Sequence, residues 1–245
     1  MILNRIYSLI TKGSKRKKEA LFANYLSILT EHFQYFNDLS VTEKNRFLHR
    51  VHKFRKSKNF HLVNQDDNIA IEVMISAAAV QVTFGLATYT MDFFDDIFVM
   101  RDAYTYGFSN VPWAGHVNHR GIHISWNHFM QGYKYKNDRY NVGLHEMAHA
   151  MEYEFHYGNY ANEETLRPTY DSVMRIVEGV LFHEEWKAVN IFTEEGLKNK
   201  HECWAESVEL FFENPGELKI YYPDLYNGIK KLLNQDPVAN IVQHH

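Results

Sequence analysis

The strongest constraint on the fold of this chain is the segment VGLHEMAHAM at residues 142–151, whose only polar side chains are two histidines and a glutamate. His145 and His149 are four residues apart, so a helix places both imidazoles on one face. Two neutral imidazole nitrogens in that arrangement can bind one Zn²⁺. Glu146 would lie beside the metal but off the ligand axis, where its carboxylate can take a proton from water. The segment therefore predicts a helix over 138–156 that carries a metal site.

The cysteine content excludes several other kinds of site. Cys203 is the only cysteine among 245 residues, so neither an intramolecular disulfide nor a multi-cysteine metal centre can form. We expect Cys203 to be a buried structural residue. No run of 18 apolar residues occurs, so no ordinary transmembrane helix is predicted, and we expect a cytoplasmic protein. The length and a hydrophobic content of 45% are typical of one globular domain.

Hydrophobic periodicity predicts a helix-rich α+β chain with a small mixed β-sheet. Besides the helix over 138–156, we expect helices over 17–37, 41–55, 68–87, 168–189, 201–213 and 222–233. The helix over 41–55 follows a capping-box pattern, Ser40-x-x-Glu43. Strands are expected over 96–104, 116–120 and 122–126.

The charges are unevenly distributed along the chain. Residues 1–60 contain 13 Lys and Arg against 4 Asp and Glu, which leaves 13 basic and 26 acidic residues in the remainder. We expect 1–60 to be a basic helical segment packed on the same domain as the catalytic part, 61–245. Within it, residues 1–18 combine an apolar stripe with a basic run and could contact a membrane surface, although docking on the chain's own domain is the interpretation we favour. The basic stretches contain few aromatic residues, so no direct nucleic-acid binding is expected.

Two histidines leave a zinc ion short of a third protein ligand. The metzincin continuation fails, because Glu152 replaces its glycine and Phe155 its third histidine, while His156 comes one position late. The ligand must therefore come from elsewhere in the chain. The predicted helix over 201–213 carries Glu202, Glu206 and Glu209 at i, i+4 and i+7, which aligns three carboxylates on one face. From spacing alone, these acids could bind the metal, contact a metal-bound histidine, or form a solvated stripe.

Two ordered motifs carry a resemblance to a known family. The segment HEMAHAME follows the strand GIHISW, and HECWAESVELFFENP begins at residue 201. Together they resemble the Mlc titration factor A family of zinc peptidases, which is related to the catalytic domain of anthrax lethal factor. The similarity covers about residues 65–235. It implies a zincin-like, gluzincin-type metallopeptidase domain that hydrolyses peptide substrates, and an aminopeptidase-like mode is one form that this activity could take.

The resemblance also assigns roles to individual residues. It implies one Zn²⁺ bound by His145, His149 and Glu202, with Glu146 as the general base. Glu209 would lie behind the ligands and orient one of them. Glu206 is grouped with it, although no specific role follows for this residue.

The strand over 122–126 is expected to be an edge strand that pairs with extended substrate. Its residues are Ile122, His123, Ile124, Ser125 and Trp126. We interpret the histidines at 116, 119, 123 and 128 mainly as surface residues.

One position departs from the family pattern. The family tends to carry a tyrosine seven residues before the third ligand, whereas this chain has Glu195, whose carboxylate would repel a developing oxyanion. This difference leaves an alternative function open. In that alternative, the chain is a regulatory binding protein of the same fold that sequesters a transcriptional repressor, with weak or no catalysis.

Overall fold

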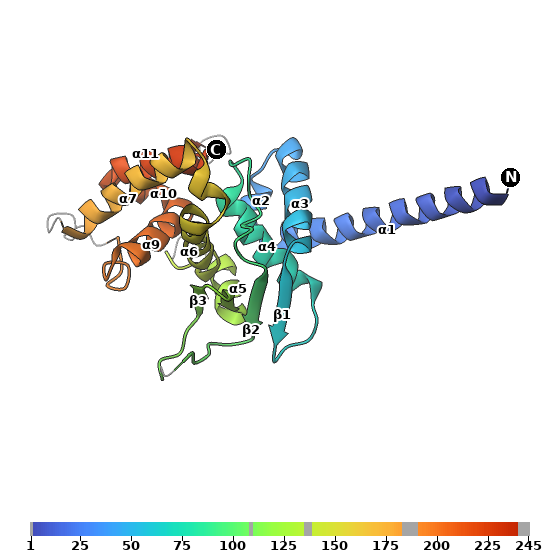
Figure 1. The fold of residues 1–245 in the computed structure, drawn as a ribbon, viewed down its shortest axis with the longest axis horizontal. Coiled ribbons are helices and arrows are strands. Elements are labelled where there is room, and N and C mark those ends of the chain that lie inside the picture. The colour runs from blue at the N-terminus through green and yellow to red at the C-terminus, as the bar shows by residue number, and fades with distance from the viewer. Residues whose placement is uncertain (1, 108–109, 135–138, 183–190, 240–245) are drawn as a thin grey trace.

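The computed structural model describes residues 2–107, 110–134, 139–182 and 191–239, with side chains from residue 16 onward. The chain is helix-rich with one small sheet, as the sequence predicts, and the helices pack to one side of the sheet (Figure 1). In chain order the elements are α1 (Ile2–His32), α2 (Gln34–Asn37), α3 (Val41–Lys56), β1 (Asn59–Val63), α4 (Ile69–Thr83), β2 (Asp96–Met100), β3 (Gly115–Asn118), β4 (Gly121–Ser125), α5 (Trp126–Lys134), α6 (Val142–Tyr157), η1 (Asn159–Asn162), α7 (Leu166–Phe182), α9 (Lys200–Glu213), α10 (Pro215–Tyr221) and α11 (Pro223–Leu233).

The sheet is mixed and has the strand order β1-β2-β4-β3. The first three of these strands are parallel, whereas β3 runs antiparallel to β4 with His116 opposite His123. Ile97, Val99 and Ile124 are fully buried, so one face of the sheet packs into the core. The strand predicted over 96–104 ends at Met100, and β1 was not predicted.

The prediction of an edge strand over 122–126 is wrong. β4 lies between β2 and β3, so its backbone groups already pair on both sides. Trp126 does not belong to the strand, because it is the first residue of α5, a helix that the sequence did not reveal. The free edge at this end of the sheet is β3.

The helix α4 occupies the centre of the fold. It is apolar around most of its circumference and nearly all of its residues are buried, as expected for a helix covered on several sides. It packs against α1 and α3 on one side and α6 on another. The basic segment and the rest of the chain therefore share one hydrophobic core, which includes Tyr25 and Phe47 from the former and Met147 from the latter.

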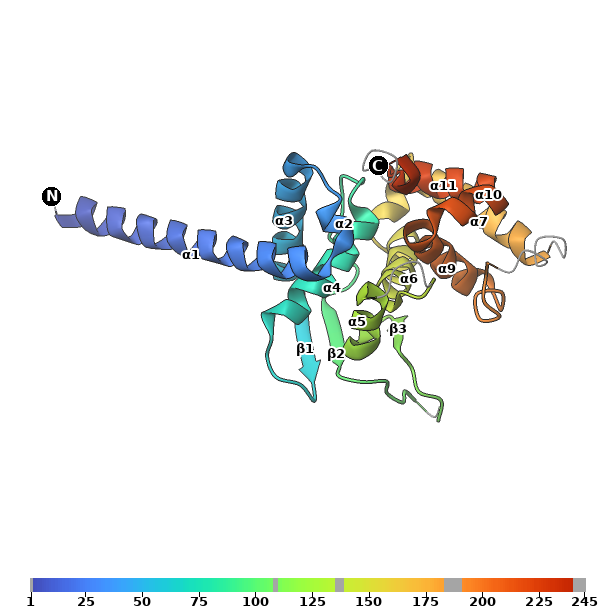
Figure 2. The same ribbon diagram turned by 180° about the vertical axis from the view of Figure 1, so that it is seen from behind.

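The first helix is longer than predicted. The sequence indicates a start near residue 17, but α1 runs without a break from Ile2 to His32. Its C-terminal part packs into the core through Tyr25 and Leu29, whereas the N-terminal part extends away from the body (Figures 1 and 2). The side chains of the apolar stripe at residues 2–10 lie outside the described part of the structure. None of the described helices combines the length and apolar character that a membrane span requires.

Several local predictions are confirmed. Ser40 and Glu43 form both hydrogen bonds of the capping box at the start of α3. Cys203 is buried, and burial raises the pKa of its thiol to about 12. The helix predicted over 168–189 begins at Leu166 and is described to Phe182, while 183–190 lie outside the described residues. The helix predicted over 201–213 ends at Glu213, and Asn214 separates it from α10, a short helix that the sequence did not predict.

Candidate metal centre

The helix α6 presents His145 and His149 to a large cavity. Its first turn is fixed by Asn141, whose side chain accepts a hydrogen bond from the backbone N–H of Leu144 at 3.1 Å. The helix then runs through the core, with Leu144, Met147 and Ala148 fully buried. The two histidines keep the i, i+4 relation that the sequence predicts, and their ring centroids are 4.9 Å apart.

The helix α9 packs beside α6 and brings Glu202 to the two histidines. Asn199 caps α9, accepting hydrogen bonds from the backbone N–H groups of His201 and Glu202 at 2.9 and 3.1 Å. This cap fixes Glu202 in the first turn. The two helices are also joined by the indole of Trp204, which donates a hydrogen bond to the backbone carbonyl of Ala148 at 2.9 Å. The side chain of Glu202 is therefore positioned by both its own helix end and the packing of α9 on α6.

The resulting group of donors has the dimensions of a metal site. His145 Nε2 is 3.2 Å from Glu202 Oε2, and His149 Nε2 is 3.6 Å from Glu202 Oε1. One donor atom from each residue lies within 4.8 Å of the other two. Two ligands of a tetrahedral zinc ion at about 2.0–2.1 Å are separated by roughly 3.4 Å. The three side chains therefore fit a single metal ion.

Glu209 lies on the other side of His145. Its Oε2 is 3.2 Å from His145 Nδ1, and its Oε1 accepts a hydrogen bond from the backbone N–H of Asn141. A proton on Nδ1 leaves the lone pair of Nε2 free for a metal, so this contact selects the tautomer that a ligand needs. Burial opposes protonation of His145, but hydrogen bonds to Glu202 and Glu209 outweigh it and raise its pKa. Hydrogen bonds to both histidines lower the pKa of Glu202, which remains a carboxylate.

Replacing Glu209 with alanine is expected to weaken zinc binding by about 10- to 100-fold, because His145 would lose the partner that fixes its tautomer and orientation. Competition with a chelator of known affinity measures this change. Glu213→Gln is a matched control on the same helix, since Glu213 contacts the Asn141 side chain at 2.9 Å instead of a histidine. Equal zinc affinity for Glu209→Ala and the wild type would contradict this role.

Glu146 projects beside the ligands as a buried carboxylate. The residue is 5% exposed, and its Oε2 has no hydrogen-bond partner within the described part of the chain. Burial raises the pKa of this group. Gly115 on β3 lies directly against it, and a side chain at that position would overlap the Glu146 carboxylate. Gly115 is not among the site residues predicted from the sequence; a glycine within a strand is the signal that could have indicated this close approach.

Glu206 has a different environment from the other two acids of α9. Its carboxylate accepts hydrogen bonds from Thr193 N at 2.7 Å and Thr193 Oγ1 at 2.9 Å. Gly196 packs so closely on this carboxylate that no side chain would fit there. Glu206 therefore anchors the segment over 193–198. This segment carries the exposed Glu195, which forms an ion pair with Lys198 at 2.5 Å.

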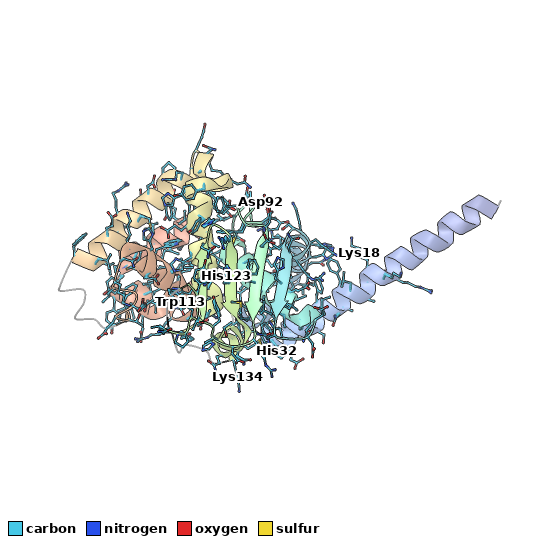
Figure 3. All side chains as sticks on the ribbon, turned by 60° about the horizontal axis from the view of Figure 1, so that its bottom comes forward. Lys18, His32, Asp92, Trp113, His123 and Lys134 are labelled. Carbon is cyan, nitrogen blue, oxygen red and sulfur yellow. The ribbon has the colours of Figure 1, made fainter. Side chains whose placement is uncertain are left out.

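The interpretation of His116 and His123 as surface histidines is wrong. Both are partly buried on the sheet, and their rings stack with centroids 4.2 Å apart. His123 is labelled on the sheet in Figure 3. His116 Nδ1 is 2.8 Å from the hydroxyl of Tyr104, and burial together with His123 lowers the pKa of His116 to about 4. His119 is exposed, and His128 is 2.8 Å from Ser125 Oγ. Within the described ranges, none of these histidines belongs to a group that could hold a metal.

The three potential metal ligands and Glu146 all line one cavity of about 1290 Å³. Its walls are formed by α6, the start of α9, the segment over 193–198 and the free edge of the sheet at β3. In Figure 3, Trp113 lies on the side of the sheet that faces α9, and this residue also lines the cavity. The metal site thus opens onto a space bordered by the outer edge of β3, which pairs with no other strand among the described residues.

Comparison with known proteins agrees with this geometry. The family model for the glucose-regulated metallo-peptidase M90 matches residues 9–233, including both motifs, and confirms the resemblance to the Mlc titration factor A family. The match begins well before residue 65, so the similarity to the family includes most of the basic segment over 1–60. A search of curated proteins finds no significant match. The helix-rich architecture with a small mixed sheet is the predicted zincin-like α+β fold. The chain therefore belongs to the glucose-regulated metallo-peptidase M90 family.

Proposed function

We propose that this chain is a zinc-dependent peptidase in which His145, His149 and Glu202 hold one metal ion. The observation that carries the proposal is the meeting of these three side chains, with separations of 3.2 and 3.6 Å between their donor atoms. A site of two imidazoles and one carboxylate suits Zn²⁺, and three protein ligands leave a position open, as in catalytic zinc sites. The arrangement is of the gluzincin type.

The chemistry divides between the metal and the protein. A bound zinc ion would supply a Lewis acid that polarises the peptide carbonyl and makes water more acidic. Glu146 would accept the proton of the attacking water and pass it to the leaving amine. One oxygen of its buried carboxylate has no hydrogen-bond partner among the residues that the structure describes, which suits a group that must exchange a proton. Glu209 would keep His145 in the required tautomer.

The free edge of β3 offers a binding surface for an extended peptide. On its other side, β3 pairs with β4, and residues Gly115–Asn118 line the cavity beside the metal site. An unpaired strand edge can bind a peptide through backbone hydrogen bonds, largely independently of its side chains. The role that the sequence suggested for residues 122–126 is thus assigned to β3 in this proposal.

Removing the metal is expected to abolish peptide cleavage, and adding one equivalent of Zn²⁺ is expected to restore it. The experiment measures cleavage of a mixed peptide library by mass spectrometry, with metal content determined on the same samples. A chelated and reloaded sample controls for irreversible unfolding. Absence of cleavage by protein that carries stoichiometric zinc, across the whole library, would contradict a peptidase function.

The exposed Glu195 at the cavity favours a second candidate function, a regulatory protein that captures a transcriptional repressor. Its carboxylate, paired with Lys198, stands where the family tends to have a tyrosine hydroxyl. In this case the partner would be retained on an affinity column by Glu146→Gln as well as by the wild type. Loss of all partner binding under native conditions would argue against this alternative.

A further inference from the structure

Glu152 is an acidic residue of the cavity that the proposed reaction does not use. It lies three residues after His149 on α6, so it shares the face of the helix that carries the metal site. It lines the same cavity as His145 and Glu202. Because residues three apart on a helix have Cβ atoms about 5–6 Å apart, Glu152 lies close to the metal site without belonging to it.

Glu152 is a largely buried residue, and only one of its two carboxylate oxygens has hydrogen-bond partners among the described residues. The residue is 7% exposed. Its Oε1 accepts a hydrogen bond from Tyr170 OH at 3.1 Å, and His201 Nδ1 and His156 Nε2 lie 2.7 and 3.9 Å from the same oxygen. Its Oε2 has no hydrogen-bond partner among the described residues. This oxygen is not itself enclosed by the protein, so it is open to the cavity and available to a donor that enters there.

The charge of the cavity favours a cationic donor. Six glutamates line it: Glu146, Glu152, Glu195, Glu202, Glu206 and Glu209. Its lysine and arginine among the described residues, Lys198 and Arg139, are each ion-paired, with Glu195 and Glu217 at 2.5 Å. One metal ion would offset only part of this negative charge. Tyr153 and Tyr157 line the cavity on the same helix as Glu152, and the faces of tyrosine rings also attract cations.

We propose that Glu152 forms a subsite for a cationic group of the substrate peptide, an ammonium or a guanidinium. The inference rests on the proposed peptidase function. An extended peptide advances about 3.3 Å per residue, so the charged group belongs to a residue one or two positions from the scissile bond. The group is either the side chain of Lys or Arg or the free amino terminus, which present the same chemistry to a carboxylate.

Binding measurements can test the subsite without depending on catalysis. The zinc-loaded full chain carrying Glu146→Gln is compared by calorimetry with the same chain that also carries Glu152→Gln. The probes are heptapeptides with one lysine at each position in turn, matched peptides with norleucine in its place, and both sets with a free or acetylated amino terminus. We expect cationic peptides to bind about 10- to 150-fold more tightly than neutral ones, and Glu152→Gln to abolish this preference.

The outcomes separate the two proposals. A preference that depends on lysine identifies a side chain as the ligand, whereas one that acetylation removes identifies the amino terminus. Equal binding of cationic and neutral peptides, or a preference that survives Glu152→Gln, overturns the subsite. Cleavage of peptides by the wild type without any such preference overturns the subsite alone. A Glu152-dependent preference in a protein that cleaves nothing overturns the peptidase function alone.

Tyr170→Phe provides the structural control. Tyr170 donates to the same carboxylate from the core side, is 1% exposed, and is not among the residues that line the cavity. If Glu152 acts only by stabilising the fold, this variant would reduce the preference as Glu152→Gln does. We expect it to lower the thermal midpoint while leaving the preference for cationic peptides within about 3-fold of its original value, less than one charge-assisted hydrogen bond provides.

Discussion

Replacing Glu146 with glutamine is expected to slow peptide cleavage by about 10²- to 10⁴-fold, the usual contribution of a general acid–base residue, while zinc stays bound. Glutamine has nearly the same shape as glutamate, so the space that Gly115 leaves for the side chain remains filled. An amide cannot accept the proton of a water molecule at neutral pH. The rate constant for cleavage and the zinc content should therefore be measured on the same preparation.

Glu154→Gln is the matched control for this substitution. Glu154 is another buried carboxylate of α6, but it accepts hydrogen bonds from Phe93 N at 2.5 Å and Asn159 N at 2.9 Å. It does not line the cavity. The amide would place a donor against one of these N–H groups, so we expect a loss of stability of about 1–3 kcal/mol and unchanged cleavage per folded molecule. Equal cleavage rates for Glu146→Gln and the wild type would reject the role of general base.

The helices of the site could be predicted because their determinants are local. The apolar residues around His145 and His149, Leu144, Met147, Ala148, Ala150 and Met151, indicate a buried helix, and all five are buried in α6. A capping box is likewise determined by residues close together in the sequence, as Ser40 and Glu43 show at the start of α3. Periodicity and capping therefore reveal which residues form the elements on which this site is built.

The separate roles of the three acids on α9 could not be read from their spacing. All three point to the same side of the helix, and each is used differently by what lies opposite. Glu202 faces two imidazoles, Glu206 holds Thr193, and Glu209 contacts the outer nitrogen of His145. The loop over 193–198 and the angle between α6 and α9 decide these contacts, and neither is encoded in a local pattern.

The strand order was hidden from the sequence for a related reason. An alternating strand shows which side chains share a face, but it does not show whether its backbone pairs on one side or both. The strand β1, with the sequence NFHLV, lies at the far edge of the sheet, and only Phe60 and Leu62 are partly buried. A stretch as short as this does not distinguish a strand from other structure. The pairing of β4 with both β2 and β3 places β4 inside the sheet, and β3 then becomes the edge beside the metal site.

Pairing between strands also explains why the partial burial of His116 and His123 was not predicted from the sequence. His116 and His123 lie on either side of a predicted turn at Gly121, so their spacing along the chain does not show that they are neighbours. The antiparallel register of β3 and β4 places them directly opposite each other, where their rings stack. His123 also stacks on Phe98 of β2, with centroids 4.6 Å apart. Their burial follows from the neighbouring strands, which a single-strand pattern does not contain.

Replacing Glu202 with alanine is expected to weaken zinc binding by more than about 100-fold, because loss of a direct ligand should exceed the effect of losing a residue behind it. The two histidines would then face each other without the carboxylate that joins them in the structure. Protein purified with limiting zinc should contain far less than one equivalent, and cleavage should fall in proportion. Metal analysis after dialysis against a weak chelator measures this directly.

Glu206→Ala distinguishes this effect from a general loss of negative charge. Glu206 lies one turn further along α9, and replacing it with alanine removes the same negative charge as Glu202→Ala does. Its hydrogen bonds, however, are with Thr193 rather than with a histidine. We expect this variant to retain one equivalent of zinc and to lose stability through the loop over 193–198. If both variants lost zinc equally, the acidic stripe would attract the ion only through its summed charge. Loss of zinc from Glu202→Ala alone would instead show that Glu202 binds the ion directly. The electrostatic attraction of a carboxylate for the ion decreases only gradually with distance, whereas coordination depends on one atom in one position.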